Sequence, residues 1–165
     1  VWCFMRIKIM MYLATAVNDS SLMSSLISIY TRSRSYHSEL VFSDGSAFAI
    51  SGKGIEMVKR KYDWYKWHLV PLPMVESGDE EFIKKDVQEI LESNPKYDWL
   101  GAIGGMWCSR LQNPDRWYCS EFCRKELKRF IPTLNNDDKW ITPDRLLKIV
   151  SEYVSERDDP VSAFK

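Results

Sequence analysis

Apolar residues alternate along the first part of the chain and recur at helical spacing in the second part. Residues 6–14 predict a strand, because alternate apolar positions put one set of side chains on one face: Ile7, Ile9, Met11 and Leu13. Residues 18–30 predict a helix, which opens on the N-cap candidates Asn18–Ser21. The remaining tail after the last predicted helix is polar.

A hairpin is the clearest feature of the first half. The apolar runs His37–Phe42 and Ala47–Ser51 flank Ser43-Asp44-Gly45-Ser46, and Asp-Gly suits a type I′ turn between antiparallel strands. Counting across this turn pairs His37 with about Gly52. Further strands are predicted at residues 55–58 and 67–72.

Three helices are predicted in the second half. Residues 77–93 begin with a capping box, with Ser77 as the cap and Glu80 three positions later. The stripe predicted to be buried on this helix comprises Phe82, Ile83, Val87, Ile90 and Leu91. Residues 119–130 form the second helix, closed by Pro132, and Thr142-Pro143 caps the third. This order of elements predicts the α+β class and one domain over residues 1–165, with an ordered core at about 6–155.

The composition supports a globular protein and excludes some partners. The chain has 165 residues, of which 45% are hydrophobic, enough for a real core. Basic and acidic residues balance at 23 each, so charge gives no case for nucleic acid as a partner. No run reaches the ~20 apolar residues of a membrane span. Residues 6–16 mimic a short signal peptide, but a buried strand explains them equally well.

The four cysteines show no disulfide framework, which favours reduced thiols and a cytoplasmic location.

Cys119 is the leading candidate for chemistry. It lies at the predicted start of a helix, where the helix dipole lowers the pKa of a thiol and favours the nucleophilic thiolate. His37 is the obvious base, and Glu39 shares its face of the strand because side chains alternate. A thiolate, a base and a group that orients the base are the parts that thiol catalysis requires.

Simpler interpretations of the same residues stay open. Buried cysteines are usually inert, and a lone histidine is usually structural. A zinc site would combine Cys108, Cys119, Cys123 and His37 or His68, but Cys-x3-Cys on a helix is a weak match to structural zinc motifs. We therefore expect no metal and no cofactor.

The motifs resemble a known family. His-x-Glu-Leu-Val-Phe before an Asp-Gly hairpin, then Tyr97-Asp98-Trp99-Leu100-Gly101, then Trp117-Tyr118-Cys119-Ser120-Glu121 look like the circularly permuted NlpC/P60 group of papain-like proteins. The likeness is to its YiiX-type and phage-encoded members and extends over about residues 10–130. In that group the histidine strand precedes the cysteine helix, as it does here. The resemblance implies an antiparallel sheet that carries the histidine, with the cysteine helix packed against it.

The resemblance also implies roles for individual residues. Cys119 would be the nucleophile, His37 the base, and Tyr97 part of an oxyanion site. Many members carry a polar residue, commonly Glu, on the strand after the histidine strand, but Ala47–Ser51 contains no acid. Glu39 or Ser51 must then orient the imidazole, or the triad is incomplete.

The resulting functional hypothesis is a thiol hydrolase or acyltransferase that works through an acyl-enzyme. By resemblance, its substrate would be a peptidoglycan peptide amide or a lipid ester. The alternative is an inactive member that serves as a binding or accessory scaffold. The sequence specifies no oligomeric state.

Overall fold

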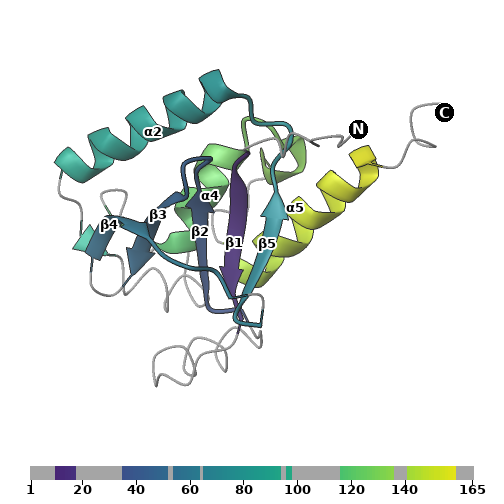
Figure 1. The fold of residues 1–165 in the computed structure, drawn as a ribbon, viewed down its shortest axis with the longest axis horizontal. Coiled ribbons are helices and arrows are strands. Elements are labelled where there is room, and N and C mark those ends of the chain that lie inside the picture. The colour runs from purple at the N-terminus through teal and green to yellow at the C-terminus, as the bar shows by residue number, and fades with distance from the viewer. Residues whose placement is uncertain are drawn as a thin grey trace, which may run out of the picture.

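A five-stranded antiparallel sheet lies at the centre of the computed structural model, which describes residues 10–17, 35–51, 54–63, 65–93, 96–97, 116–135 and 141–158. Its strands run in the order β4-β3-β2-β1-β5 (Figure 1). Their bounds are β1 (Tyr12–Ala16), β2 (His37–Val41), β3 (Ser46–Ser51), β4 (Gly54–Lys59) and β5 (Trp67–Pro71). Helices pack against this sheet, so the predicted α+β class is confirmed.

The strands follow their sequence patterns with small shifts. Met11 and Leu13 are buried as predicted, but β1 runs to Ala16 rather than ending at Ala14. Strand β5 ends on Pro71, which an edge strand tolerates because its outer N–H groups need no partner strand. The predicted helix over 18–30, the first half of the predicted strand over 6–14 and the polar tail lie outside the described residues.

The β2–β3 hairpin is confirmed, but its turn is not the predicted type I′. The N–H of Gly45 donates to the carbonyl of Phe42 at 2.9 Å, which puts Ser43 and Asp44 at the centre of the turn. Gly45 follows with φ 79°, a left-handed conformation that glycine adopts without steric cost. A three-residue loop of this kind shifts the register by one residue relative to the predicted two-residue turn.

The observed register of β2 and β3 near the turn also differs from the predicted one. The paired residues of β2 and β3 are Val41 with Ala47 and Leu40 with Phe48. Among the described residues, none of β2 before Leu40 has a partner on β3, and the predicted partner Gly52 lies outside them. On its other side β2 pairs with β1 along its whole length, from Val41 to His37.

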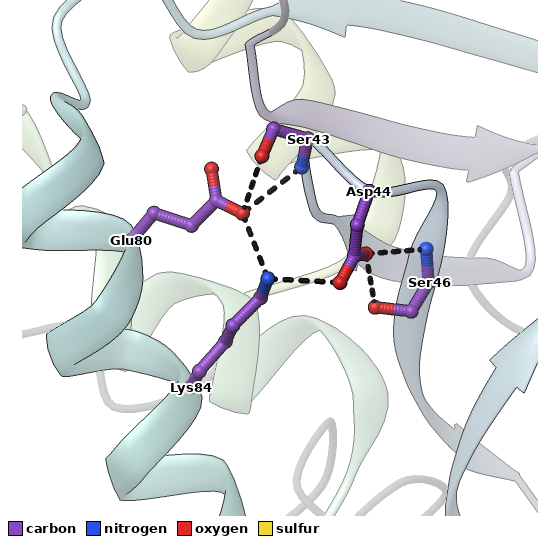
Figure 2. Close-up of polar contacts among 5 residues, drawn as sticks. All are labelled: Ser43, Asp44, Ser46, Glu80 and Lys84. Atoms are coloured by element: carbon purple, nitrogen blue, oxygen red, sulfur yellow. Dashed lines mark hydrogen bonds and ion pairs between the residues drawn. The ribbon is translucent and has the colours of Figure 1, made fainter.

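A polar network ties the hairpin to α2 (Ser77–Glu92), which passes over the hairpin end of the sheet (Figures 1 and 2). Glu80 Oε1 accepts hydrogen bonds from the backbone N–H of Ser43 at 3.0 Å and from its hydroxyl at 2.8 Å. Lys84 Nζ lies 3.1 Å from the same oxygen and 3.0 Å from Asp44 Oδ2. Four charged or polar side chains thus fix where the hairpin meets the helix.

This network explains why the predicted capping box was misplaced by one residue. The N-cap of α2 is Glu76, whose backbone N–H donates to Asp79 Oδ2 at 3.2 Å. Glu80 faces the hairpin instead of the helix start. On the predicted buried stripe Ile83 and Val87 are buried, but Phe82 is 52% exposed and lies under the Arg129 guanidinium.

The main core lies between one face of the sheet and the helices. Helix α4 (Cys119–Leu127) packs on β2 and β3, and α5 (Pro143–Asp158) packs on β1 and β5. The rings of Phe48 and Phe122 meet at 4.2 Å between β3 and α4. Among the helices of the described residues, none has the length and apolarity to cross a membrane.

The end of α4 differs from the boundary predicted from the sequence, whereas the start of α5 agrees with it. Helix α4 ends at Leu127 rather than Phe130, and Pro132 opens a 3₁₀ turn (Pro132–Asn135) instead of closing the helix. Helix α5 opens at Pro143 as predicted, and the N–H of Arg145 donates to Thr142 Oγ1 at 3.1 Å.

Candidate active site

His37 and Cys119 meet where β3 separates from β2. Because the β2–β3 ladder stops at Leu40, the first residues of β2 have no β3 partner, and α4 packs against this strand. The Cys119 thiol hydrogen-bonds with the His37 side chain. The backbone N–H groups of Ser38 and Ser120 also point at the sulfur. The site therefore brings together the first residue of a strand and the first residue of a helix, which are distant in sequence.

The environment shifts the two groups in opposite directions. Burial alone lowers the pKa of His37, but the polar contacts of its ring with Cys119 and Glu39, and the negative charges of these two groups, outweigh burial and raise this pKa from 6.5 to about 9. Burial alone raises the pKa of the Cys119 thiol, but the hydrogen bond and charge of His37 and the two N–H groups outweigh it. The pKa of Cys119 is therefore lowered. The pair favours thiolate and imidazolium over two neutral groups.

Glu39 lies behind the imidazole, on the same face of β2 as the alternation predicted. Its Oε2 is 3.5 Å from His37 Nε2, an ion-pair separation rather than a short hydrogen bond. The neighbours across the sheet are Ala14 opposite Glu39 and Ala16 opposite His37, whose small side chains leave room on this face. Because Nε2 faces Glu39, Nδ1 is the ring nitrogen left for the Cys119 sulfur.

Two residues that the sequence did not single out as members of the site hold the other oxygen of Glu39. Tyr62 donates its hydroxyl to Oε1 at 2.7 Å, and Arg60 Nε lies 3.3 Å from the same atom. Both residues lie between β4 and β5, in a segment without periodicity, so no sequence signal linked them to the histidine strand.

The ring of Trp67 contacts several of the side chains around the site. Its ring meets His37 edge-on at 6.0 Å and Tyr62 edge-on at 5.1 Å. The Arg60 guanidinium lies over the same ring at 5.7 Å. Trp67 was predicted only as a strand residue, yet it packs against three of the polar side chains around the site.

The residues on either side of Cys119, Tyr118 and Ser120, both hydrogen-bond to the backbone of Ile141, shortly before α5. Ser120 donates its hydroxyl to the carbonyl of Ile141 at 2.7 Å, and the N–H of Ile141 donates to the Tyr118 hydroxyl at 3.3 Å. Ser120 is fully buried and Tyr118 is 3% exposed. Burial and the nearby Glu121 charge raise the pKa of Tyr118, so its hydroxyl stays protonated. This double anchor fixes the start of α4 and hence the position of the sulfur.

Other predicted members of the site are described in part. The backbone of Tyr97 lies in β6 (Lys96–Tyr97) and pairs in parallel with Trp117 of β7 (Arg116–Trp117), two residues before Cys119. The side chains of Tyr97 and Ser51 lie outside the described residues, as does Cys108. The oxyanion role of Tyr97 and the orienting role of Ser51 therefore stay predictions.

Cys123 and the zinc alternative can be judged from the same region. Cys123 is 1% exposed, and burial together with the Cys119 charge raises its pKa well above the ordinary value, so it is a core thiol. His68 is exposed on β5. Within the described ranges, no group of three or more His, Cys, Asp or Glu side chains is arranged to hold a metal ion.

Comparison with known proteins adds no family assignment. A scan against protein-family models finds no match to the chain. Neither a search of curated proteins nor a search of solved structures finds a match. The likeness to permuted NlpC/P60 proteins therefore depends on the short motifs quoted above.

Proposed function

We propose that this protein is a thiol hydrolase or acyltransferase in which Cys119 is the nucleophile and His37 the general base. The observation that carries this proposal is the hydrogen bond between the two side chains, with the buried Glu39 carboxylate behind the imidazole. Cysteine chemistry requires a thiolate, a proton acceptor within reach and a group that orients the acceptor. These three side chains supply those parts.

The charges around the site support the same assignment. Arg60, Glu39, His37 and Cys119 form a row in which positive and negative groups alternate. Each buried charge then has an opposite charge beside it, which lowers the cost of keeping the thiolate and imidazolium away from water. Glu39, with a fully buried side chain, takes the place of the acid that the second strand lacks. The scaffold alternative was based on that missing acid, so the Glu39 contact favours the enzyme.

The proposed reaction has two halves. The Cys119 thiolate attacks the carbonyl carbon of an amide or ester, and the backbone N–H of Cys119 at the helix start stabilises the oxyanion. The His37 imidazolium then donates its proton to the leaving amine or alkoxide as the acyl thioester forms. Neutral His37 next takes a proton from water, or from an acceptor nucleophile, which attacks the thioester and releases the acyl group. By its motifs, the substrate class is a peptidoglycan peptide amide or a lipid ester.

Trapping of the acyl-enzyme tests this proposal. The protein is incubated with p-nitrophenyl acetate, and release of p-nitrophenolate is followed together with peptide mass mapping. We expect a burst of p-nitrophenolate and one acetyl group on the peptide that contains Cys119. Acylation of a thiol is the step that this site should accelerate, even on a small activated ester.

Two variants serve as matched controls. Cys119→Ser should abolish the burst, whereas Cys123→Ser should retain it because Cys123 is a buried core thiol on the same helix. A burst that survives in Cys119→Ser, or acetylation confined to other residues, would refute the assignment of the nucleophile. A protein that gives no acylation at all would support the scaffold alternative.

A further inference from the structure

The Glu39 carboxylate is held by three side chains that divide its two oxygens between them. Oε1 takes the Tyr62 hydroxyl and the Arg60 guanidinium, at 2.7 Å and 3.3 Å. Oε2 faces only His37 among the described residues, at 3.5 Å, and makes no hydrogen bond by distance and angle. The shortest and best-formed contact of this carboxylate is therefore the one from Tyr62.

A carboxylate can rotate about its last carbon–carbon bond, so its orientation must be fixed by its partners. Glu39 is fully buried, and water cannot replace a partner that is lost. The 3.5 Å contact with His37 is too long to fix the rotation by itself. The hydroxyl of Tyr62 is neutral, so it can orient the carboxylate without competing with the imidazolium as a positive charge.

Tyr62 is itself held in place by the ring of Trp67. Its ring packs edge-on against Trp67 at 5.1 Å, and Trp67 packs edge-on against His37 at 6.0 Å. Burial and the Glu39 charge raise the pKa of Tyr62, so its hydroxyl keeps its proton as a donor. One aromatic side chain thus fixes both the donor and the ring that the carboxylate must face.

We propose that Tyr62 is a positioning residue, which holds Glu39 Oε1 so that Oε2 is presented to His37 Nε2. This inference rests on the proposed function, because it assigns Tyr62 a role in the same site. Among the described residues, the titratable groups that face the imidazole are Cys119 from α4 and Glu39 from β2, with Arg60 and Tyr62 acting through Glu39.

The direct test is an NMR titration of His37 in the intact protein and in Tyr62→Phe. The chain has two histidines, and His68 is exposed on β5, so its signal is an internal reference. In the unchanged protein we expect His37 to titrate with a pKa of about 9. In Tyr62→Phe the carboxylate loses its orienting hydrogen bond, and we expect the pKa to fall by roughly one pH unit. An unchanged or higher His37 pKa in a folded Tyr62→Phe protein would overturn the proposal.

A double-mutant cycle separates positioning from a general structural role. Glu39→Gln should lower the His37 pKa more than Tyr62→Phe does, because it removes the charge itself. Adding Tyr62→Phe to Glu39→Gln should produce no further shift, since the hydroxyl then has no carboxylate to orient. A further shift of similar size in that background, or a Glu39→Gln variant in which His37 still titrates near 9, would contradict the proposal.

Tyr65→Phe is the matched control. Tyr65 lies in the same segment, is 51% exposed, and directs its hydroxyl at Asp63 Oδ2 rather than at Glu39. The same phenol-to-phenyl change there should leave the His37 pKa unchanged. An equal fall in Tyr65→Phe would mean that the effect does not pass through Glu39 and would overturn the proposal.

Failure of the role proposed for Tyr62 can be distinguished from failure of the proposed thiol hydrolase function. The titration reads His37 directly and needs no substrate. If Cys119 forms an acyl-enzyme but Tyr62→Phe leaves His37 unchanged, only the role of Tyr62 is lost. If no acyl-enzyme forms but the cycle shows the expected coupling, Tyr62 positions Glu39 in a site that is not a thiol hydrolase.

Discussion

At the scale of single residues, the site depends on a balance between burial and paired charge. Burial opposes both the imidazolium of His37 and the thiolate of Cys119, yet each group supplies the charge that the other needs. The folded protein favours protonated His37. Its contribution to stability is therefore complete below pH 6.5 and is lost as the pH rises through about 9.

Cys119→Ser should show this mutual dependence. A serine hydroxyl carries no charge at neutral pH, so the pKa of His37 should fall below about 9, while burial and Glu39 continue to act on it. The NMR signal of His37 measures the change. A His37 pKa that stays near 9 would show that Glu39 alone sustains the imidazolium and that the sulfur contributes nothing.

At the scale of elements, the start of α4 is the part that must be placed accurately. Ser120 and Tyr118 bind the carbonyl and the N–H of Ile141 on either side of the nucleophile. These contacts orient a helix N-terminus whose dipole and N–H groups already favour a thiolate. Neither contact was visible in the sequence, because a Tyr-Cys-Ser string does not reveal which distant backbone group it will meet.

Ser120→Ala should reveal the strength of this anchor. It leaves the Ile141 carbonyl without its buried donor, so we expect the free energy of unfolding to fall by about 1–3 kcal/mol. Denaturant unfolding measures the loss. Ser155→Ala, at an exposed position of α5, should change it by less than about 0.5 kcal/mol. Equal effects of the two substitutions would mean that the Ser120 bond does not stabilise the protein.

Local sequence patterns predicted the strands and helices better than they predicted the contacts between them. Strand alternation placed His37 and Glu39 on one face, and the helix signal placed its start at Cys119. The hairpin register was wrong by one residue because Asp-Gly suits more than one turn, and hydrogen bonding selected the three-residue loop. Tyr62, Arg60 and Trp67 were missed because their link to Glu39 and His37 arises only when the segment between β4 and β5 folds back onto the histidine strand.

At the scale of the whole molecule, the site lies where a helix layer meets the sheet. Phe122 of α4 is 1% exposed and packs on Phe48 of β3, which holds the nucleophile helix against the sheet. Phe82 on α2 was predicted to serve the same kind of role, but it is 52% exposed. The two phenylalanines therefore offer a matched comparison of core and surface.

Phe122→Ala should lower the free energy of unfolding by about 3–5 kcal/mol, because it removes a ring from a closely packed core. Phe82→Ala should cost no more than about 1 kcal/mol, most of it the loss of the cation–π contact with Arg129. Thermal or denaturant unfolding of both variants measures the difference. Similar losses would contradict the packing of α4 on the sheet through Phe122.

The central claim is that His37 keeps Cys119 as a reactive thiolate, and the pH dependence of alkylation tests it most directly. The intact protein and His37→Ala are treated with iodoacetamide across the pH range, and peptide mass mapping follows Cys119 separately from the other cysteines. We predict that Cys119 of the intact protein reacts well below the pH of about 8.5 at which a free thiol ionises. In His37→Ala burial acts unopposed by the imidazolium, so the profile should move above that pH, with at least a tenfold loss of rate at neutral pH. Superimposable profiles, with Cys119 reacting as an ordinary thiol in both proteins, would contradict the account.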